Sequence, residues 1–218
     1  LADDVARRLL RRVDDKGRAC LAVSGGRTPI AFLRALSEQQ LPWSKILVTL
    51  VDERWVPETS DASNAALVRE YLLRGKASAA YFLPLWNRAA SPVAGVMDCE
   101  NRLHEQILRM DVAVLGMGLD GHTASWFPHS QALVSCLDEG GAAWCCPVMD
   151  AEVTPARMTL TWACLRQCQH LFLHIEGSDK NRVLEQALAS CSADQWASMP
   201  VRRVLSQSDV PMSIYRTD

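Results

Sequence analysis

Short apolar runs alternate along the chain with longer segments in which apolar residues recur every three or four positions. The runs are rich in Val, Ile and Leu, and they cover residues 19–26 (ACLAVSGG), 45–53 (KILVTLVDE), 111–118 (DVAVLGMG) and 170–177 (HLFLHIEG). Such runs are typical of strands that are buried on both faces. The periodic segments have the spacing of amphipathic helices, and they are residues 30–40, 65–73, 96–110 and 181–190.

This alternation predicts an α/β fold in which a mainly parallel sheet carries helices on both sides. The apolar run at residues 142–149 (AAWCCPVM) also has the character of a strand, whereas residues 77–92 are the least regular part and are expected to form a surface connection. Ligands of such sheets bind in the crevice beyond the carboxyl ends of the strands. The residues that directly follow each apolar run are therefore the candidates for chemistry.

The composition limits the kinds of protein that this chain can be. With 218 residues, of which 49% are hydrophobic and 22% charged, we expect a single domain over residues 1–218. The net charge of -2 gives no broad basic field, so nucleic acid is not an expected partner. The apolar runs are too short to cross a bilayer, and the charged start of the chain is no secretory signal, so we expect a cytoplasmic protein without membrane contacts. The chain starts at Leu1 and not at a methionine, which leaves open what precedes it.

The cysteines show neither the spacing of a metal site nor that of a disulfide framework. They form no C-x-x-C pair and no Cys/His quartet, so buried or spectator thiols are expected. Cys145 and Cys146 are neighbours in a predicted strand and should point to opposite faces. His170 and His174 share one face of a strand, but one element supplies only two ligands, so we expect no metal there. The cysteines are Cys20, Cys99, Cys136, Cys145, Cys146, Cys164, Cys168 and Cys191.

The turn SGGRTP, residues 24–29, follows the first apolar run. Gly25 and Gly26 permit close approach of the backbone, and Thr28 is a good helix cap. Pro29 suits the first helical position, and free N–H groups at that helix start favour a phosphate. An ordinary strand-to-helix turn accounts for the stretch equally well.

Charged residues follow two further runs. In VDERWVP, residues 51–57, we expect Asp52, Glu53 and Arg54 at the rim of the crevice. The planar fork of Arg54 suits a phosphate or carboxylate, and a solvated cluster of ion pairs is the alternative. In IEGSDK, residues 175–180, Ser178 can cap a helix and Lys180 lies in its first turn. A cation there opposes the helix dipole, which indicates a nearby anion unless the lysine is simply exposed to solvent.

The stretch GMGLDGHTASWFP, residues 116–128, matches G-x-G-x-x-G after a strand, and Asp138 lies at the distance of a ribose-binding acid. A dinucleotide site also needs a helix that opens at the third glycine, and Pro128 interrupts the segment too soon. We therefore predict a loop that presents Asp120 and His122 at a strand end. Imidazole titrates near neutral pH and suits a general base, and a carboxylate can orient it. A loop histidine bonded to a backbone carbonyl is the alternative.

The order of these motifs resembles the 6-phosphogluconolactonase family over nearly the whole chain, in SGGRTP, VDERWVP with SDASNAALVREYLL, GMGLDGHTASWFP, PARMTLT and EGSDKNRVLEQAL. The resemblance implies a three-layer α/β sandwich around a mainly parallel sheet, similar to the Rossmann-like folds of sugar-phosphate isomerases and deaminases. It implies hydrolysis of a phosphorylated sugar lactone, the δ-lactone of 6-phosphogluconate, in the oxidative branch of the pentose phosphate pathway. No organic cofactor is implied, and we expect a monomer or a weak homo-oligomer.

By this resemblance, the catalytic histidine falls on His122, with Asp120 beside it in the same loop. His122 is expected to take a proton from water and return it to the ring oxygen, while the phosphate serves as a remote handle. The chain has no G-x-S-x-G elbow that would offer a covalent nucleophile. The expected substrate-binding residues are Ser24, Gly25, Gly26, Thr28, Asp52, Arg54, Thr123, Arg157 and Lys180.

Three other functions fit parts of the pattern. Glucosamine-6-phosphate deaminases share the D-G-H loop but continue with an Asn-Glu-Pro segment, whereas Phe127 stands before Pro128 here and cannot transfer a proton. A non-catalytic sugar-phosphate sensor would keep the phosphate grip and lose the base, yet His122 and Asp120 are both present. A nicotinamide-dependent dehydrogenase fits least, because its glycine motif requires a helix that the sequence does not predict.

Overall fold

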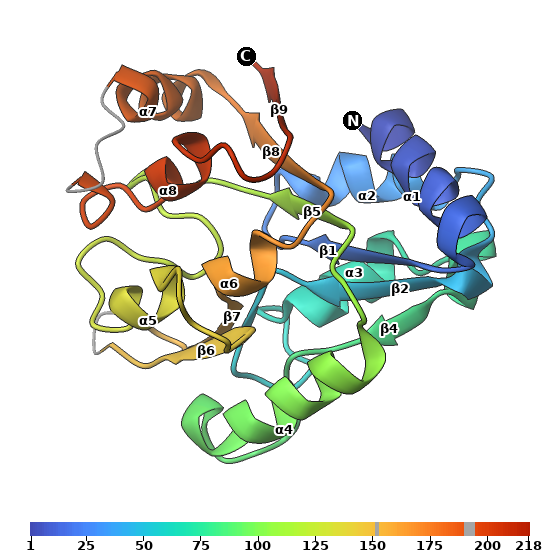
Figure 1. Cartoon of the computed structure of the whole chain (residues 1–218), viewed down its shortest axis with the longest axis horizontal. Helices are drawn as coiled ribbons and strands as arrows, with labels where there is room; N and C mark the ends of the chain where they lie inside the picture. Colours follow the sequence, from blue (N-terminus) through green and yellow to red (C-terminus); the bar gives the residue numbers. More distant parts are fainter. Residues whose placement is uncertain (151–152, 190–194) are drawn as a thin grey trace.

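The computed structural model has a six-stranded sheet at its centre (Figure 1). It describes residues 1–150, 153–189 and 195–218, so Cys191 lies outside the described residues. The strand order is β4-β2-β1-β5-β8-β9, and every neighbouring pair runs parallel. The strands are β1 (Ala19–Val23), β2 (Ile46–Leu50), β4 (Tyr81–Leu83), β5 (Val112–Leu115), β8 (His170–Glu176) and β9 (Met212–Thr217).

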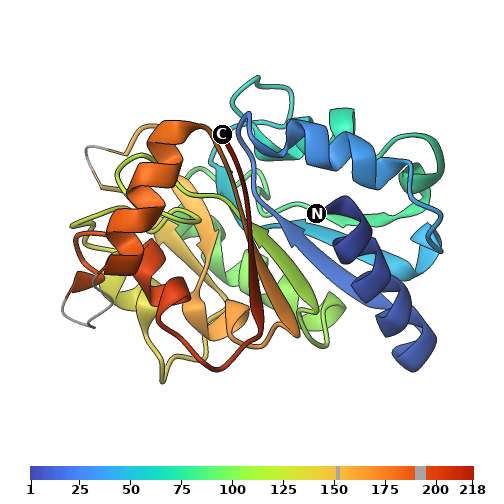
Figure 2. The same cartoon turned by 90° about the horizontal axis from the view of Figure 1, so that it is seen from above.

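Helices flank this sheet, and the predicted α/β fold with a mainly parallel sheet is confirmed. In Figure 2 the orange helix α7 and the blue helices α1 and α2 stand on opposite sides of the dark red strand β9. No helix within the described residues is long and apolar enough to span a membrane. The helices are α1 (Ala2–Lys16), α2 (Pro29–Ser37), α3 (Asn64–Tyr71), α4 (Pro92–Gln106), α5 (Leu133–Leu137), α6 (Trp162–Leu165), α7 (Ser178–Ala189) and α8 (Val201–Leu205), with short 3-10 turns η1 (Trp43–Lys45) and η2 (Gly75–Ala79).

The apolar runs form the buried centre of the molecule. All residues of β1 and β5 are buried, and in β8 only Glu176 at the end is exposed. Continuous Val, Leu and Ile are stable in a strand only when helices cover both of its faces, as they do here. Burial of these apolar strands therefore fixes the positions of the strand ends, and the polar residues follow those ends.

A second, three-stranded antiparallel sheet was not predicted as a unit. It has the order β3-β7-β6 and consists of β3 (Asp52–Arg54), β7 (Arg157–Leu160) and β6 (Cys145–Val148). The strand predicted at residues 142–149 is confirmed as β6. The expectation of a surface connection at residues 77–92 is wrong in part, because β4 lies there as an edge strand that pairs with β2. Three residues, the first of them exposed, are too few to show a strand pattern.

The cysteines within the described residues are free and buried, as predicted. Cys145 and Cys146 point to opposite faces of β6, because the thiol of Cys145 meets Cys99 and that of Cys146 meets Cys136. The hydrogen bond with the neighbouring thiol and, after it, burial raise the pKa of both Cys136 and Cys145. Protonated, apolar thiols of this kind act as small core residues.

The strand order creates a crevice at one edge of the sheet. Strand β1 lies between β2 and β5. The strand order therefore reverses at β1, because β2 lies on one side of β1 and β5, which comes later in the chain, lies on the other side. Ligands of open α/β sheets bind at this switch point, beyond the carboxyl ends of the strands. The candidate site lies there.

Candidate active site

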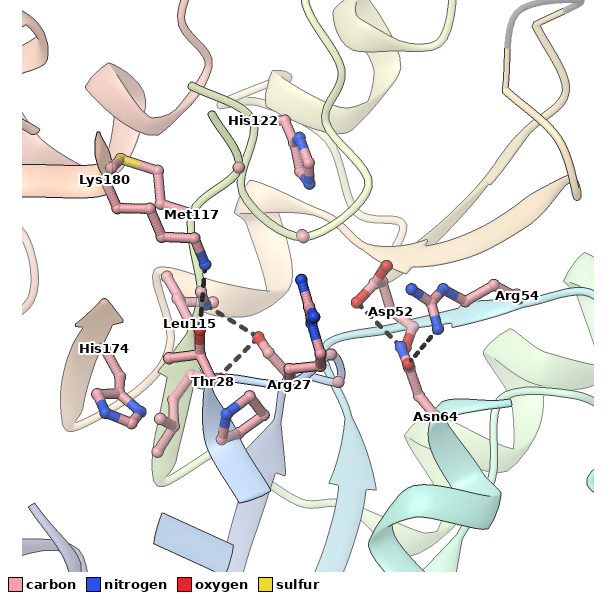
Figure 3. Close-up of a pocket in the computed structure, with 18 residues that line it drawn as sticks. Arg27, Thr28, Asp52, Arg54, Asn64, Leu115, Met117, His122, His174 and Lys180 are labelled. Carbon is pink, nitrogen blue, oxygen red and sulfur yellow. Dashed lines mark hydrogen bonds between the residues drawn. The ribbon is translucent and has the colours of Figure 1, made fainter. Parts of the chain in front are cut away.

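A cavity of about 230 Å³ opens at the carboxyl ends of β1 and β5 (Figure 3). Segments that are far apart in the chain line it, among them the turn after β1, strand β3, the start of α3, the loop after β5, strand β8 and the first turn of α7. This is the place at which the sequence predicted a ligand. The polar and charged lining residues are Ser24, Arg27, Thr28, Asp52, Arg54, Asn64, His122, His174 and Lys180.

The turn after β1 is tied to the segment that follows β5. The hydroxyl of Ser24 donates a hydrogen bond to the carbonyl of Val114 (3.0 Å) and accepts one from the N–H of Gly116 (3.2 Å). These bonds hold two walls of the cavity together. Ser24 therefore supports the cavity from its floor, while Gly25 and Gly26 form the lining next to it.

Thr28 precedes α2 but does not cap it, contrary to the prediction. Its backbone has helical torsion angles, and its hydroxyl makes no hydrogen bond to the helix. The hydroxyl instead accepts a hydrogen bond from Nζ of Lys180 at 3.1 Å. Burial lowers the pKa of Lys180, an effect that Glu176 opposes and Arg27 reinforces. The ammonium group thus lies at the turn and not in open solvent.

Strand β3 carries charged residues with different surroundings. Side chains alternate along a strand, so Asp52 and Arg54 line the cavity while Glu53 points away and is fully buried. The prediction that Glu53 lies at the rim is therefore wrong. Its carboxyl accepts hydrogen bonds from the hydroxyl of Ser63 and from the N–H groups of Arg54, Asn64 and Ala65. Burial outweighs these bonds and raises the pKa of Glu53 to about 7.

Asn64, the first residue of α3, links the two cavity side chains of β3 and was not identified from the sequence. Its Oδ1 accepts a hydrogen bond from Nη1 of Arg54 (2.9 Å), and its Nδ2 donates one to the carbonyl of Asp52 (2.8 Å). Gly25 approaches it so closely that a Cβ there would lie 1.8 Å from Oδ1. The sequence around Asn64 indicated only the start of a helix, which is why its role was missed.

The loop after β5 presents His122 to the cavity. Nδ1 of His122 lies 2.5 Å from Oδ1 of Asp120, which also accepts the backbone N–H of His122 at 3.1 Å. Burial raises the pKa of Asp120, but the hydrogen bonds and the electrostatic interaction with His122 hold that pKa below the ordinary value. A Cβ on Gly118 would lie 2.2 Å from the imidazole, so the loop needs a glycine at this point. Asp120 therefore fixes the ring through Nδ1.

Buried polar groups anchor the same loop. Thr123 is fully buried and its hydroxyl donates to the carbonyl of Gly116 (2.8 Å), so Thr123 lies behind the cavity wall and does not line it. The hydroxyl of Ser125 donates to Oδ2 of Asp52 (2.6 Å), and the N–H of Ser125 donates to the hydroxyl of Thr159 (3.2 Å). The histidine loop is thereby joined to β3 and to β7.

Arg157 stands opposite Arg54 in the antiparallel pair of β3 and β7. It does not line the cavity of His122 but a neighbouring groove, which Asp120 lines as well. Burial and, to a smaller extent, the charge of Arg54 lower the pKa of Arg157. Nη1 of Arg157 is buried without a hydrogen-bond partner in the described part of the chain. Its proximity to the substrate stays a prediction.

Two cavity residues were not recognised as site residues from the sequence. Arg27 rises from the turn after β1 toward His122 (Figure 3). His174 was considered only in a metal pair with His170; burial lowers the pKa of His174, and its Nε2 lies 3.4 Å from Oε1 of Glu176. Within residues 1–150, 153–189 and 195–218, no group of His, Cys, Asp or Glu is arranged to hold a metal ion.

The arrangement combines one base with several cations around a small cavity. His122, oriented by Asp120, can accept a proton from water, and Arg27, Arg54 and Lys180 can hold the anionic groups of a ligand. Such a set suits hydrolysis or isomerisation of a small phosphorylated molecule.

Comparison with known proteins agrees with this geometry. The family model described as glucosamine-6-phosphate isomerases/6-phosphogluconolactonase matches residues 1–212. A 6-phosphogluconolactonase of Pseudomonas aeruginosa is 46% identical over 215 residues, which cover 99% of this chain and 88% of that protein. One from Rhizobium meliloti is 44% identical over 99% of this chain and 91% of its own length.

The fold gives the same result. A crystal structure of a 6-phosphogluconolactonase from Shewanella baltica matches with a TM-score of 0.94 and 38% identity, and the match covers 100% of this chain and 91% of that chain. Similarity in sequence and in fold extends over the whole chain and includes the segments that build the cavity. The chain therefore belongs to the family of glucosamine-6-phosphate isomerases and 6-phosphogluconolactonases.

Proposed function

We propose that this protein hydrolyses 6-phospho-D-glucono-1,5-lactone to 6-phospho-D-gluconate, a step of the oxidative branch of the pentose phosphate pathway. Its relatives with 46% and 44% identity are 6-phosphogluconolactonases. The observation that carries the proposal is the pair of His122 and Asp120 facing a cavity that Arg54 and Lys180 also line. The lactone presents a reactive carbonyl to the base and a phosphate to the cations. The protein is accordingly a carboxylic ester hydrolase.

In the proposed mechanism, His122 acts as the general base. Asp120 accepts a hydrogen bond from Nδ1, which leaves the lone pair of Nε2 to take a proton from water. The resulting hydroxide attacks the lactone carbonyl, the bond between that carbon and the ring oxygen breaks, and Nε2 returns the proton to the ring oxygen. A lactone is a reactive ester, so this route needs no covalent intermediate with the protein.

The phosphate is assigned to the turn after β1. There, Nζ of Lys180 lies against the hydroxyl of Thr28, beside the first turn of α2, whose N–H groups favour an anion. A phosphate would also compensate for the burial that lowers the pKa of Lys180. Arg54 lies on the other side of the cavity with Asn64 (Figure 3) and is assigned to the oxygen of the lactone carbonyl, where negative charge develops.

Phe127 weighs against deamination of an amino sugar phosphate. Its ring centroid lies 4.7 Å from that of His122, so an apolar ring occupies the position before Pro128. Phenylalanine has no proton to donate for the ring opening that such a reaction requires. Release of ammonia from glucosamine 6-phosphate at a rate comparable to lactone hydrolysis would contradict this assignment.

The test is a coupled assay with freshly generated lactone, in which spontaneous opening is subtracted and wild type is compared with His122→Asn. We expect the variant to lose about 100-fold or more in kcat, the usual contribution of a positioned acid-base group. Binding of 6-phosphogluconate, measured by calorimetry, should persist because the cations are intact. His104→Asn, a change at an exposed histidine of α4, is the matched control. Unchanged turnover in His122→Asn would remove this residue from the mechanism.

A further inference from the structure

We propose that Arg27 is a substrate-binding residue that closes on the phosphate of the substrate together with Lys180. The inference rests on the proposed lactonase function and deepens it. Arg27 lies in the turn between Gly26 and Thr28, directly before α2, and its side chain lines the cavity. Figure 3 shows the guanidinium extending from this turn into the space below His122.

Arg27 differs from the other two cations of the cavity in how it is held. Nζ of Lys180 is fixed on the hydroxyl of Thr28, and Nη1 of Arg54 is fixed on Oδ1 of Asn64. The side chain of Arg27 is exposed, and no residue in the described part of the chain forms a hydrogen bond or an ion pair with it. Its guanidinium is therefore free to reorient and to form all of its bonds with a ligand.

The charges around Arg27 favour an anion at this end of the cavity. Arg27 acts electrostatically on Lys180, and no carboxylate in the described residues lies within ion-pair distance of either group. Two cations of the same cavity repel each other, and an anion between them removes that repulsion. A phosphate monoester carries about two negative charges at neutral pH, which one ammonium group does not neutralise.

The chemistry of guanidinium fits the second contact. Its planar fork binds two oxygens of a phosphate at once, whereas an ammonium acts as a point charge. Lys180 would thus neutralise one charge from a fixed position, and Arg27 would close over the remaining oxygens after the substrate has entered. The backbone of Arg27 belongs to the turn assigned to the phosphate, which distinguishes it from Arg54 on the carbonyl side.

The experiment compares Arg27→Ala and Arg27→Lys with wild type on two substrates, the phosphorylated lactone and unphosphorylated glucono-δ-lactone. For the phosphorylated lactone we expect Arg27→Ala to raise KM by about 10-fold or more, equivalent to about 1.4 kcal/mol, with kcat within about 3-fold. Arg27→Lys should lie between the two, since it keeps the charge and loses the fork. For the unphosphorylated lactone, kcat/KM should not change. Arg74→Ala, which removes an exposed arginine outside the cavity, is the matched control.

Several outcomes would overturn the inference. An unchanged KM for the phosphorylated lactone in Arg27→Ala would show that Arg27 does not bind the phosphate. An equal loss of kcat on both lactones would place Arg27 at the carbonyl instead. If wild type hydrolyses neither lactone, the proposed function fails, and calorimetry with 6-phosphogluconate then decides about Arg27: the inference requires weaker binding by Arg27→Ala, and equal affinities contradict it.

Discussion

Replacement of Gly25 by alanine tests whether Asn64 organises the cavity. An added Cβ would lie 1.8 Å from Oδ1 and 2.1 Å from Cγ of Asn64, so the amide has to move. Once displaced, Asn64 can no longer accept the hydrogen bond from Arg54 or donate to the carbonyl of Asp52. The substitution at Gly25 is therefore expected to act on Arg54 through Asn64.

The hydrogen bonds that are lost set the size of this effect. A bond to a charged group contributes about 1.5–3 kcal/mol, and a neutral one about 0.5–1.5 kcal/mol. The organised arrangement of Arg54 thus loses about 2 kcal/mol or more. If Arg54 meets the developing charge on the carbonyl oxygen, that loss lowers kcat/KM for the lactone by about 30-fold.

A double-mutant cycle identifies Asn64 as the intermediary. Asn64→Ala removes the amide, so the added methyl group of Gly25→Ala meets no obstacle in that background and should change kcat/KM by less than about 3-fold. The expected coupling energy is about 1–2 kcal/mol, within the range for residues in direct contact. The four proteins are compared in the coupled lactone assay, and their thermal unfolding confirms that each one is folded. If Gly25→Ala lowers kcat/KM by the same factor in both backgrounds, the reasoning is refuted.

Two further predictions concern buried groups next to the cavity. Burial raises the pKa of Glu53 from its ordinary value of 4.5 to about 7, so the folded state binds this proton more tightly than the unfolded state does. The resulting stabilisation is complete below about pH 4.5 and is lost as the pH rises through about 7. We therefore expect the free energy of unfolding, measured by urea denaturation, to fall by about 3 kcal/mol over this range. An identical pH profile of stability in Glu53→Gln would contradict this prediction. Ser125→Ala removes the hydrogen bond to Asp52 and loosens the histidine loop, so kcat should fall by about 10-fold with little change in KM. Ser130→Ala, farther along the same segment, is the control, and an equal kcat in Ser125→Ala and wild type would show that the bond does not position His122.

The helices and strands that could be predicted from the sequence are those in which one hydrophobic pattern extends over enough residues to be recognised. The four long apolar runs all form strands, as short runs rich in Val, Ile and Leu favour a strand that is covered on both faces. The helix expected at residues 96–110 begins earlier, at Pro92, where Ser91 caps it through the N–H of Ala94, and it ends earlier, at Gln106. Strands β3 and β4 have three residues each, which is too short for a period to be recognised.

The candidate site was predictable where a residue lies in the segment that follows a buried strand. His122 and Lys180 are of this kind, since the strand that precedes each of them fixes the edge of the sheet at which it emerges. Asn64 lies at the start of a helix, and its hydrogen bonds with Arg54 and Asp52 hold it at the cavity, which no local pattern of the sequence indicates. The burial of Glu53 depends on the register of β3, and one step along a strand reverses the face of every side chain. The register of a strand as short and as charged as β3 cannot be predicted from its sequence pattern.

The contacts between protein groups divide the cavity into a rigid part and an adjustable part. Ser125 joins the histidine loop to Asp52, and Asn64 joins Asp52 to Arg54, so His122 and Arg54 are held in one continuous network. A rigid arrangement is what catalysis requires there, because groups already oriented toward the developing charge need no reorganisation during the reaction. Arg27 stands outside this network. If Arg27 binds the phosphate as proposed, the binding energy would order Arg27 without disturbing the geometry of His122, so the cavity would admit a charged substrate while His122 stays fixed.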